Sequence, residues 1–92
     1  MSRIATIRAA LEGALQPVSL ELVDDSHLHA GHAGAATGRG HYSVHIVSSR
    51  FAGLTPIARH RRVYEALGAL MQTDIHALSI RAQTPEEAAR SR

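Results

Sequence analysis

The sequence predicts an α+β fold, a two-layer sandwich in which two helices cover one face of a three-stranded sheet. Two segments carry apolar residues at helical spacing, and three others alternate apolar and polar residues. Along the 92 residues these segments follow the order helix, strand, strand, helix, strand. A chain of this length forms one domain around one core. We assign residues 1–82 to that domain and residues 83–92 to a C-terminal tail.

The first half of the chain predicts a helix, a strand and a long loop. The helix is expected to begin after Ser2, which can cap it, and to end before Pro17. Its apolar residues recur at spacings of three and four: Ile4, Ile7, Leu11 and Leu15. Residues 18–23 alternate as a half-buried strand does. Residues 24–40 are polar and rich in Gly and Ala, and loops of this length in small domains usually have a function.

The second half predicts two more strands around a second helix. Residues 42–47 alternate and can pair antiparallel with the first strand, and Thr55 followed by Pro56 indicates a helix start. The helix should carry one apolar stripe at spacings of three and four, made of Ile57, His60, Val63, Tyr64, Leu67, Leu70 and Met71. A third strand begins at about Ile75 and is expected to run parallel to the second, because a helix connects them. The tail from Pro85 is expected to be helical or frayed.

The composition narrows the class of protein. The net charge is +2, all ten basic residues are arginine, and the pI near 9.9 permits nucleic-acid contact without requiring it. No cysteine is present, so a disulfide framework is excluded. No apolar run approaches the ~20 residues of a membrane span, and no signal-peptide core is seen, so we expect a cytoplasmic protein without a membrane partner. We expect no enzymatic activity, because no nucleophile motif or phosphate-binding loop occurs.

Seven histidines make metal binding a candidate function, because imidazole is the commonest metal ligand. Three of them, His27, His29 and His32, fall in the long loop, and His41 follows at its end. A zinc site made of these four is one interpretation. No firm helix or strand would preorganise the three loop histidines, which weakens it.

The other histidines have separate expected roles. His60 belongs to the apolar stripe of the second helix, so we expect it to pack under the loop as a structural residue. His45 is expected to face solvent on the second strand. His76 opens the third strand and shares its parity with Leu78 and Ile80, which predicts a position at the rim of the buried face. A rim position would hold the imidazole while leaving one nitrogen reachable.

Five motifs in this order and spacing resemble the BolA-like family, from about Ile4 to Ala82. They are Leu20-Glu21-Leu22-Val23-Asp24-Asp25-Ser26-His27, His29-Ala30-Gly31-His32, Phe51-Ala52-Gly53-Leu54, Arg59-His60-Arg61-Arg62-Val63-Tyr64 and Ile75-His76-Ala77-Leu78. The resemblance implies an αββαβ fold similar to a type II KH domain. It also implies an adaptor that binds a monothiol glutaredoxin and shares a 2Fe–2S cluster with it, in iron–sulfur trafficking or iron regulation.

The resemblance further implies which residues would hold that cluster. His76 corresponds to one family ligand, and the second comes from the loop between the first two strands. Alignment on the motif around Ser26 favours His29, with His32 and His41 as alternatives. The thiolates of glutaredoxin and glutathione would hold the other iron. Alone, the chain is expected to be a monomer or a weak homodimer.

A basic segment near the start of the second helix predicts a contact surface, made of Arg50, Arg59, Arg61 and Arg62. We expect Arg59, Arg61 and Arg62 to face an acidic protein partner, and a contact between His60 and that partner is the alternative to its structural role. The alternative is a KH-like nucleic-acid-binding transcription regulator, in which Arg50, Arg59 and Arg62 contact DNA. A KH module needs a Gly-x-x-Gly loop, and residues 51–56 at the corresponding place lack the second glycine. The adaptor interpretation therefore ranks first.

Overall fold

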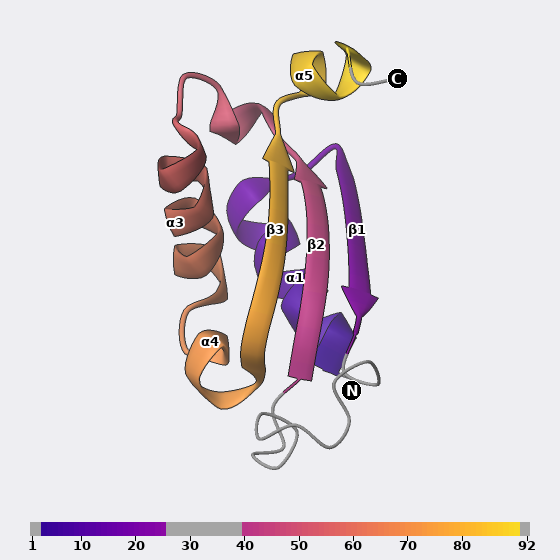
Figure 1. Ribbon diagram of the computed structural model, residues 1–92, viewed down its shortest axis with the longest axis vertical. Helices are drawn as coiled ribbons and strands as arrows, with labels where there is room; N and C mark the ends of the chain where they lie inside the picture. The colour runs from indigo at the N-terminus through magenta and orange to yellow at the C-terminus, as the bar shows by residue number, and fades with distance from the viewer. Residues whose placement is uncertain (1–2, 26–39, 91–92) are drawn as a thin grey trace.

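The structure, a computed structural model, describes residues 3–25 and 40–90. Figure 1 shows its elements, which are α1 (Arg3–Leu15), β1 (Ser19–Asp24), β2 (Gly40–Val47), η2 (Ser49–Phe51), α3 (Pro56–Leu67), α4 (Leu70–Thr73), β3 (Ile75–Gln83) and α5 (Pro85–Arg90). The predicted α+β class is confirmed, and α4 and η2 are additions that the sequence pattern did not indicate. The third strand extends through Gln83, and the residues after it form α5.

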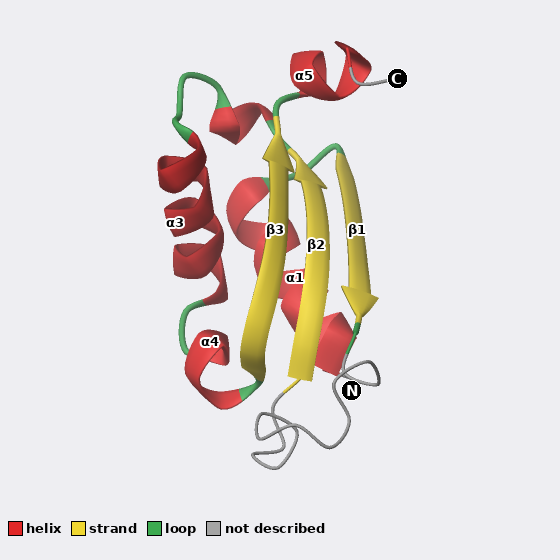
Figure 2. Cartoon of the chain, viewed as in Figure 1, coloured by secondary structure: helices red, strands yellow, loops and turns green. Residues whose placement is uncertain are grey.

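The sheet has the strand order β1-β2-β3. β1 pairs antiparallel with β2, and β2 pairs parallel with β3, which confirms both predicted pairings. The helices α1 and α3 pack against each other on one face of the sheet (Figure 2). The opposite face is left for solvent, which an alternating polar and apolar pattern allows.

The core lies between the sheet and the two long helices. In β2, every second residue from Tyr42 to Ile46 is buried, because successive side chains of a strand point to opposite faces. The residues that complete the buried cluster come from α1, η2, α3 and the start of β3: Ile7, Leu11, Leu15, Phe51, Val63, Leu67 and Ile75. The predicted apolar faces of α1 and β2 are therefore confirmed.

Helix α3 begins as predicted and ends earlier than its apolar stripe suggests. The hydroxyl of Thr55 accepts a hydrogen bond from the amide of Ala58 at 3.1 Å, and Pro56 is the first helical residue. The helix stops at Leu67 because Gly68 adopts a φ of +54°, in the left-handed region that favours glycine. The last residues of the stripe consequently belong to the separate turn α4.

The expectation that His60 packs as a structural residue is wrong. The face that α3 buries is centred on Val63 and includes Arg59 rather than His60. His60 is exposed on the flank of this face, together with Ile57 and Tyr64, which are 67% and 42% exposed.

Among the described residues, no helix is long and apolar enough to span a membrane.

Candidate functional site

Two histidines from different strands meet at one end of the sheet. His41 is the second residue of β2, and His76 is the second residue of β3. Because β2 and β3 are neighbouring parallel strands, they begin at the same end of the sheet. The two imidazole rings lie with their centroids 5.0 Å apart and their planes tilted by 50°. The structure thus brings together His76 and one of the three predicted alternatives for its partner.

A bulge in β3 decides how His76 is presented. Gly40 pairs with Ile75, but the next residue, His41, pairs with Ala77, so that His76 is the extra residue in β3. Ile75 enters the core and His76 is exposed. The predicted parity between His76 and Leu78 is therefore wrong, because the alternation of the strand does not continue through the bulge. The imidazole is nevertheless reachable, as a ligand requires.

The backbone around the two histidines is held by neighbouring segments. The amide of Asp25 donates to the carbonyl oxygen of His41 at 2.8 Å, and the amide of Gly40 donates to that of Asp74 at 2.9 Å. The hydroxyl of Ser43 donates to the carboxylate of Asp25. These bonds connect the end of β1 and the residue before β3 to the start of β2. The two histidines therefore extend from backbone that is fixed on both sides.

A negative charge stands next to the start of β3. The hydroxyl of Thr73 donates to Asp74 at 2.5 Å, and the guanidinium of Arg3 donates to it at 3.1 Å. These two bonds lower the pKa of Asp74, with the Thr73 bond as the larger cause. Asp74 is therefore ionised at neutral pH and paired with Arg3, and this ion pair ties the N-terminal end of α1 to the residue before β3.

The remaining predicted metal ligands, His27, His29 and His32, lie outside the described residues. Within residues 3–25 and 40–90, no group of three or more His, Asp or Glu side chains is arranged to hold a metal ion. The histidine pair can still form part of a shared site. Two imidazoles bound to one tetrahedral metal at about 2.0–2.1 Å have ring centres roughly 5 Å apart, which agrees with the observed spacing.

Arg59 has a structural role at the end of the molecule where β3 finishes, opposite to the end that carries the two histidines. Its side chain is only 13% exposed. The guanidinium donates to the carbonyl oxygens of Leu54 and Ala82 at 3.0 and 3.1 Å, and to both carboxylate oxygens of Glu87 at 2.6 and 3.0 Å. These bonds use four of its five N–H donors. Arg59 is thereby removed from the predicted contact surface and ties α5 to α3.

The other predicted contact residues remain on the surface. Arg61 and Arg62 are exposed on α3, next to the exposed His60. Arg50 is exposed on η2, where its guanidinium donates to the side-chain oxygen of Gln16 at 2.6 Å. The basic segment of the sequence is consequently divided between one internal arginine and three surface arginines.

A polar row on the open face of the sheet was not predicted from the sequence. His45 was expected to face solvent without a special role, but its imidazole contacts Gln83 on β3 and Glu21 on β1. The alternation of β1 and β2 could have indicated this row, because it places Glu21 and His45 on the same face once the two strands pair.

Comparison with known proteins identifies the family. The family model described as BolA-like protein matches residues 11–87. BolA-like protein 1 of Mus musculus is 49% identical over 83 residues, which are 90% of this chain and 58% of the mouse protein. The DNA-binding transcriptional regulator BolA of Escherichia coli is 40% identical over 81 residues, covering 88% of this chain and 74% of that protein.

Solved structures indicate the same family. The BolA domain of SufE1 from Arabidopsis thaliana superposes with a TM-score of 0.83 at 43% identity, covering 95% of this chain and 96% of that domain. The chain spans less than two thirds of the mouse relative's length. The descriptions of the family model and of the mouse relative indicate no enzyme family. The matched fold, motifs and family model together show that this chain belongs to the BolA-like protein family.

Proposed function

We propose that this protein is an adaptor that binds a monothiol glutaredoxin and contributes imidazole ligands to a 2Fe–2S cluster. The cluster would be shared with the glutaredoxin and with glutathione, in iron–sulfur trafficking or iron regulation. The observation that carries the proposal is the pair of His41 and His76, whose ring centroids are 5.0 Å apart at the end of the sheet. In a member of the BolA-like family, this end is where the ligand-bearing strand begins.

The chemistry of the chain fits half of such a site. Without cysteine, this protein can offer imidazole but no thiolate to iron. The thiolates must therefore come from the partner protein and from glutathione. When bound, the cluster supplies electron-transfer or cluster-transfer chemistry, and histidine ligands raise its reduction potential. An imidazole binds metal through a deprotonated ring nitrogen, so ligation requires the neutral form of the side chain.

The family motif and the geometry favour different residues as the second cluster ligand. The family motif favours His29, and the geometry favours His41, because only His41 is placed beside His76 among the described residues. If His29 is the ligand, the contact from His41 orients the ring of His76, as residues around metal ligands commonly do. The two assignments predict different effects of substitution.

The exposed flank of α3 supports a protein partner. Ile57 and Tyr64 leave apolar surface uncovered there, and His60 and Arg61 lie between them at helical spacing. An apolar strip with basic residues in it is complementary to an acidic surface that also carries apolar side chains. We place the glutaredoxin contact on this flank.

Nucleic-acid binding is the alternative, and the Escherichia coli relative carries the name of a DNA-binding regulator. The residues available for it are few. Of the three arginines predicted to contact DNA, Arg59 is engaged inside the protein, Arg50 is exposed but bonded to Gln16, and Arg62 is exposed on α3. Affinity for the DNA backbone grows with the number of phosphates that are neutralised. The adaptor function is therefore better supported.

The deciding experiment mixes this protein with a cluster-bearing monothiol glutaredoxin and glutathione, and follows visible circular dichroism. The unsubstituted chain should produce a new spectrum, and His76→Ala should abolish it. Loss in His29→Ala with retention in His41→Ala assigns the second ligand to His29, and the reverse result assigns it to His41. His32→Ala tests the third alternative. His45→Ala, which removes a histidine from the middle of the sheet, is the matched control.

Two results would refute the proposal. One is a heterodimer that forms without any change in the visible spectrum. The other is a spectrum that His76→Ala leaves intact.

A further inference from the structure

The open face of the sheet carries a row of three ionisable side chains, one from each strand. Glu21 on β1 pairs in register with His45 on β2, and His45 pairs in register with Arg81 on β3. Residues in register on neighbouring strands point to the same face. The row therefore places a negative charge, an imidazole and a positive charge side by side, on the face opposite to α1 and α3.

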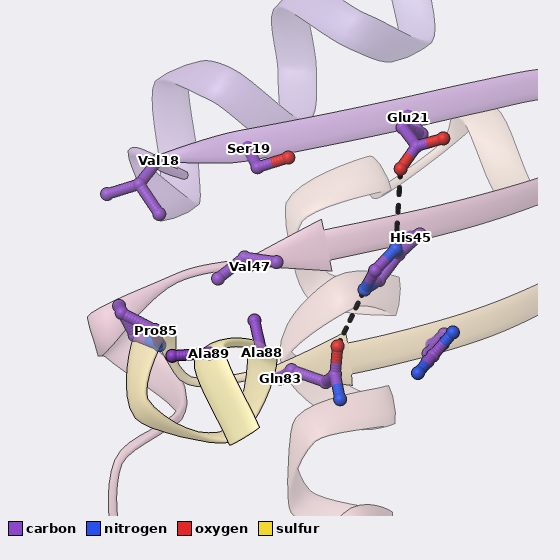
Figure 3. A pocket seen from close by; sticks show the side chains of 10 residues that line it. Val18, Ser19, Glu21, His45, Val47, Gln83, Pro85, Ala88 and Ala89 are labelled. Atoms are coloured by element: carbon purple, nitrogen blue, oxygen red, sulfur yellow. Dashed lines mark hydrogen bonds and ion pairs between the residues drawn. The ribbon is translucent and has the colours of Figure 1, made fainter. Parts of the chain in front are cut away.

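The imidazole in the middle is fixed, whereas the two outer charges are accessible. Figure 3 shows the ring of His45 between Glu21 and Gln83. Its Nε2 atom is 2.7 Å from the side-chain oxygen of Gln83, and its Nδ1 atom is 3.5 Å from the carboxylate of Glu21. The His45 side chain is 29% exposed, and that of Glu21 is 73% exposed. Arg81 is exposed and forms no ion pair with the described residues.

Two hollows meet at this row. The larger has a volume of about 530 Å³, and the smaller, on the side of Val23, has a volume of about 270 Å³. Both are lined by Glu21, His45 and Arg81. A volume of roughly 300–1,000 Å³ is typical of sites that bind small molecules. The larger hollow is therefore of a size that can hold a ligand of several non-hydrogen atoms.

The larger hollow has an apolar end. It is formed by Val18 before β1, by Val47 at the end of β2 and by Pro85 and Ala88 from α5, which Figure 3 shows to one side of the row. Helix α5 is held there by the bonds between Arg59 and Glu87. A ligand in this hollow would meet apolar surface at one end and two opposite charges at the other.

We propose that this hollow binds a small zwitterion of dipeptide size. Its carboxylate would pair with Arg81, its ammonium group with Glu21, and its apolar side chain would contact Val47 and α5.

Charge and length both favour this class of ligand. A simple anion would be attracted by Arg81 but repelled by Glu21, whereas a zwitterion satisfies both. The backbones of β1 and β3 are two strand spacings apart, about 9.5 Å. Two extended residues span at most about 7 Å, and the long side chains of Glu21 and Arg81 can cover the difference.

The site is separate from the proposed metal function. The row lies along the middle of the sheet, and the ligand contacts neither His41 nor His76. Failure of cluster binding would therefore leave this inference unaffected, and failure of ligand binding would leave the adaptor function unaffected.

The test is a titration of ¹⁵N-labelled protein with glycyl-L-leucine, followed by the amide shifts of the row and of α5. Two analogues remove one charge each: glycyl-L-leucinamide lacks the carboxylate, and N-acetylglycyl-L-leucine lacks the ammonium group. We expect saturable binding with a Kd of roughly 0.1–10 mM, typical of exposed charge pairs with a small apolar contact. Each analogue should bind about two- to fivefold more weakly, as the loss of one exposed charge pair implies.

Variants of the row complete the test. Arg81→Gln and Glu21→Gln should each weaken glycyl-L-leucine binding to the level of the corresponding analogue, while Arg62→Gln on α3 serves as the control. The exposure of both side chains means that the fold should persist, which the same spectra report. Equal affinity for the three ligands, absence of saturation by about 100 mM, or binding unchanged in both row variants would overturn the proposal.

Discussion

The two ends of the sheet use polar side chains in opposite ways. At the end where β2 and β3 begin, the imidazole of His76 is exposed and that of His41 lies beside it. At the end where both strands finish, Ser48 is fully buried and Arg59 is mostly buried, and their polar atoms bond to other parts of the protein. The first end leaves the imidazole of His76 at the surface, and the second uses polar groups to join segments that are distant in sequence.

Ser48 illustrates the second use. Its hydroxyl donates to the carbonyl oxygen of Leu15 at 2.7 Å and accepts from the amide of Arg50 at 3.1 Å. Its own amide donates to the carbonyl oxygen of Gln83 at 2.9 Å. One small residue thus connects the end of α1, the start of η2 and the end of β3. Buried polar groups need such partners, because leaving one unpaired costs about 1–3 kcal/mol.

Glu87 combines a helix cap with an ion pair. Its amide donates to the hydroxyl of Thr84 at 3.2 Å, and its carboxylate accepts from the amide of Thr84 at 2.9 Å. This reciprocal arrangement is a capping box at the start of α5. The same carboxylate binds Arg59, so the cap also docks the helix. We therefore expect stability to respond to substitutions at this end, and the proposed binding of a cluster to respond to substitutions at the other.

Among the polar side chains, the largest expected effect on stability is that of Arg59→Met. The carbonyl oxygens of Leu54 and Ala82 would lose their charged donor, and the anchor of α5 would be lost. We expect the free energy of unfolding in urea to fall by about 2 kcal/mol. The matched control is Arg62→Met on the exposed side of α3, which should change it by less than about 0.5 kcal/mol. Equal effects of the two variants would contradict the structural role of Arg59.

A smaller effect on the free energy of unfolding is expected when the carboxylate of Glu87 is protonated. Hydrogen bonds from Arg59, and next from the Thr84 amide, hold its pKa at about 2, below the ordinary 4.5. Because the folded-state pKa is the lower one, the stabilisation is complete above the unfolded-state pKa and is lost as the pH falls toward the folded-state value. The unfolding free energies of the natural chain and Glu87→Gln, measured from about pH 6 to about pH 3, should therefore converge on acidification. Parallel curves would show that the pair does not stabilise the fold.

The smallest effect on stability is expected at the histidine end. His76 is exposed, so His76→Ala should change the unfolding free energy by less than about 0.5 kcal/mol. The preceding residue is a matched control: Ile75 is buried, and Ile75→Ala should cost about 2–5 kcal/mol. Both values come from the same urea titration. A large loss in His76→Ala would mean that this end is structural and would remove the contrast between the two ends.

Local patterns predicted much of the fold. The alternation in β2 predicted the buried side of Tyr42 and Val44, and the pair Thr55 and Pro56 predicted where α3 begins. Such features depend on residues close together in the chain, whose spacing follows the period of the helix or strand. The candidate ligand His76 was likewise placed correctly at the start of a strand.

Other features depend on contacts between distant residues, and these were missed or wrong. Arg59 replaces His60 on the inner side of α3 because Glu87, 28 residues later, and two backbone carbonyls receive its donors. The bulge that exposes His76 arises from the register between β3 and β2, to which no single segment points. The row of Glu21, His45 and Arg81 needs all three strands to be in register.

By itself, the sequence determined the α+β class, the order of the elements and the absence of thiolate ligands, because periodicity and residue type are properties of the chain alone. Only the tertiary structure decided that His41 stands beside His76, that Arg59 is internal, and that opposite charges flank His45 on the open face. The physical reason is that strand register and helix rotation are set by packing and hydrogen bonds between distant segments, and a shift of one residue would change which side chains meet.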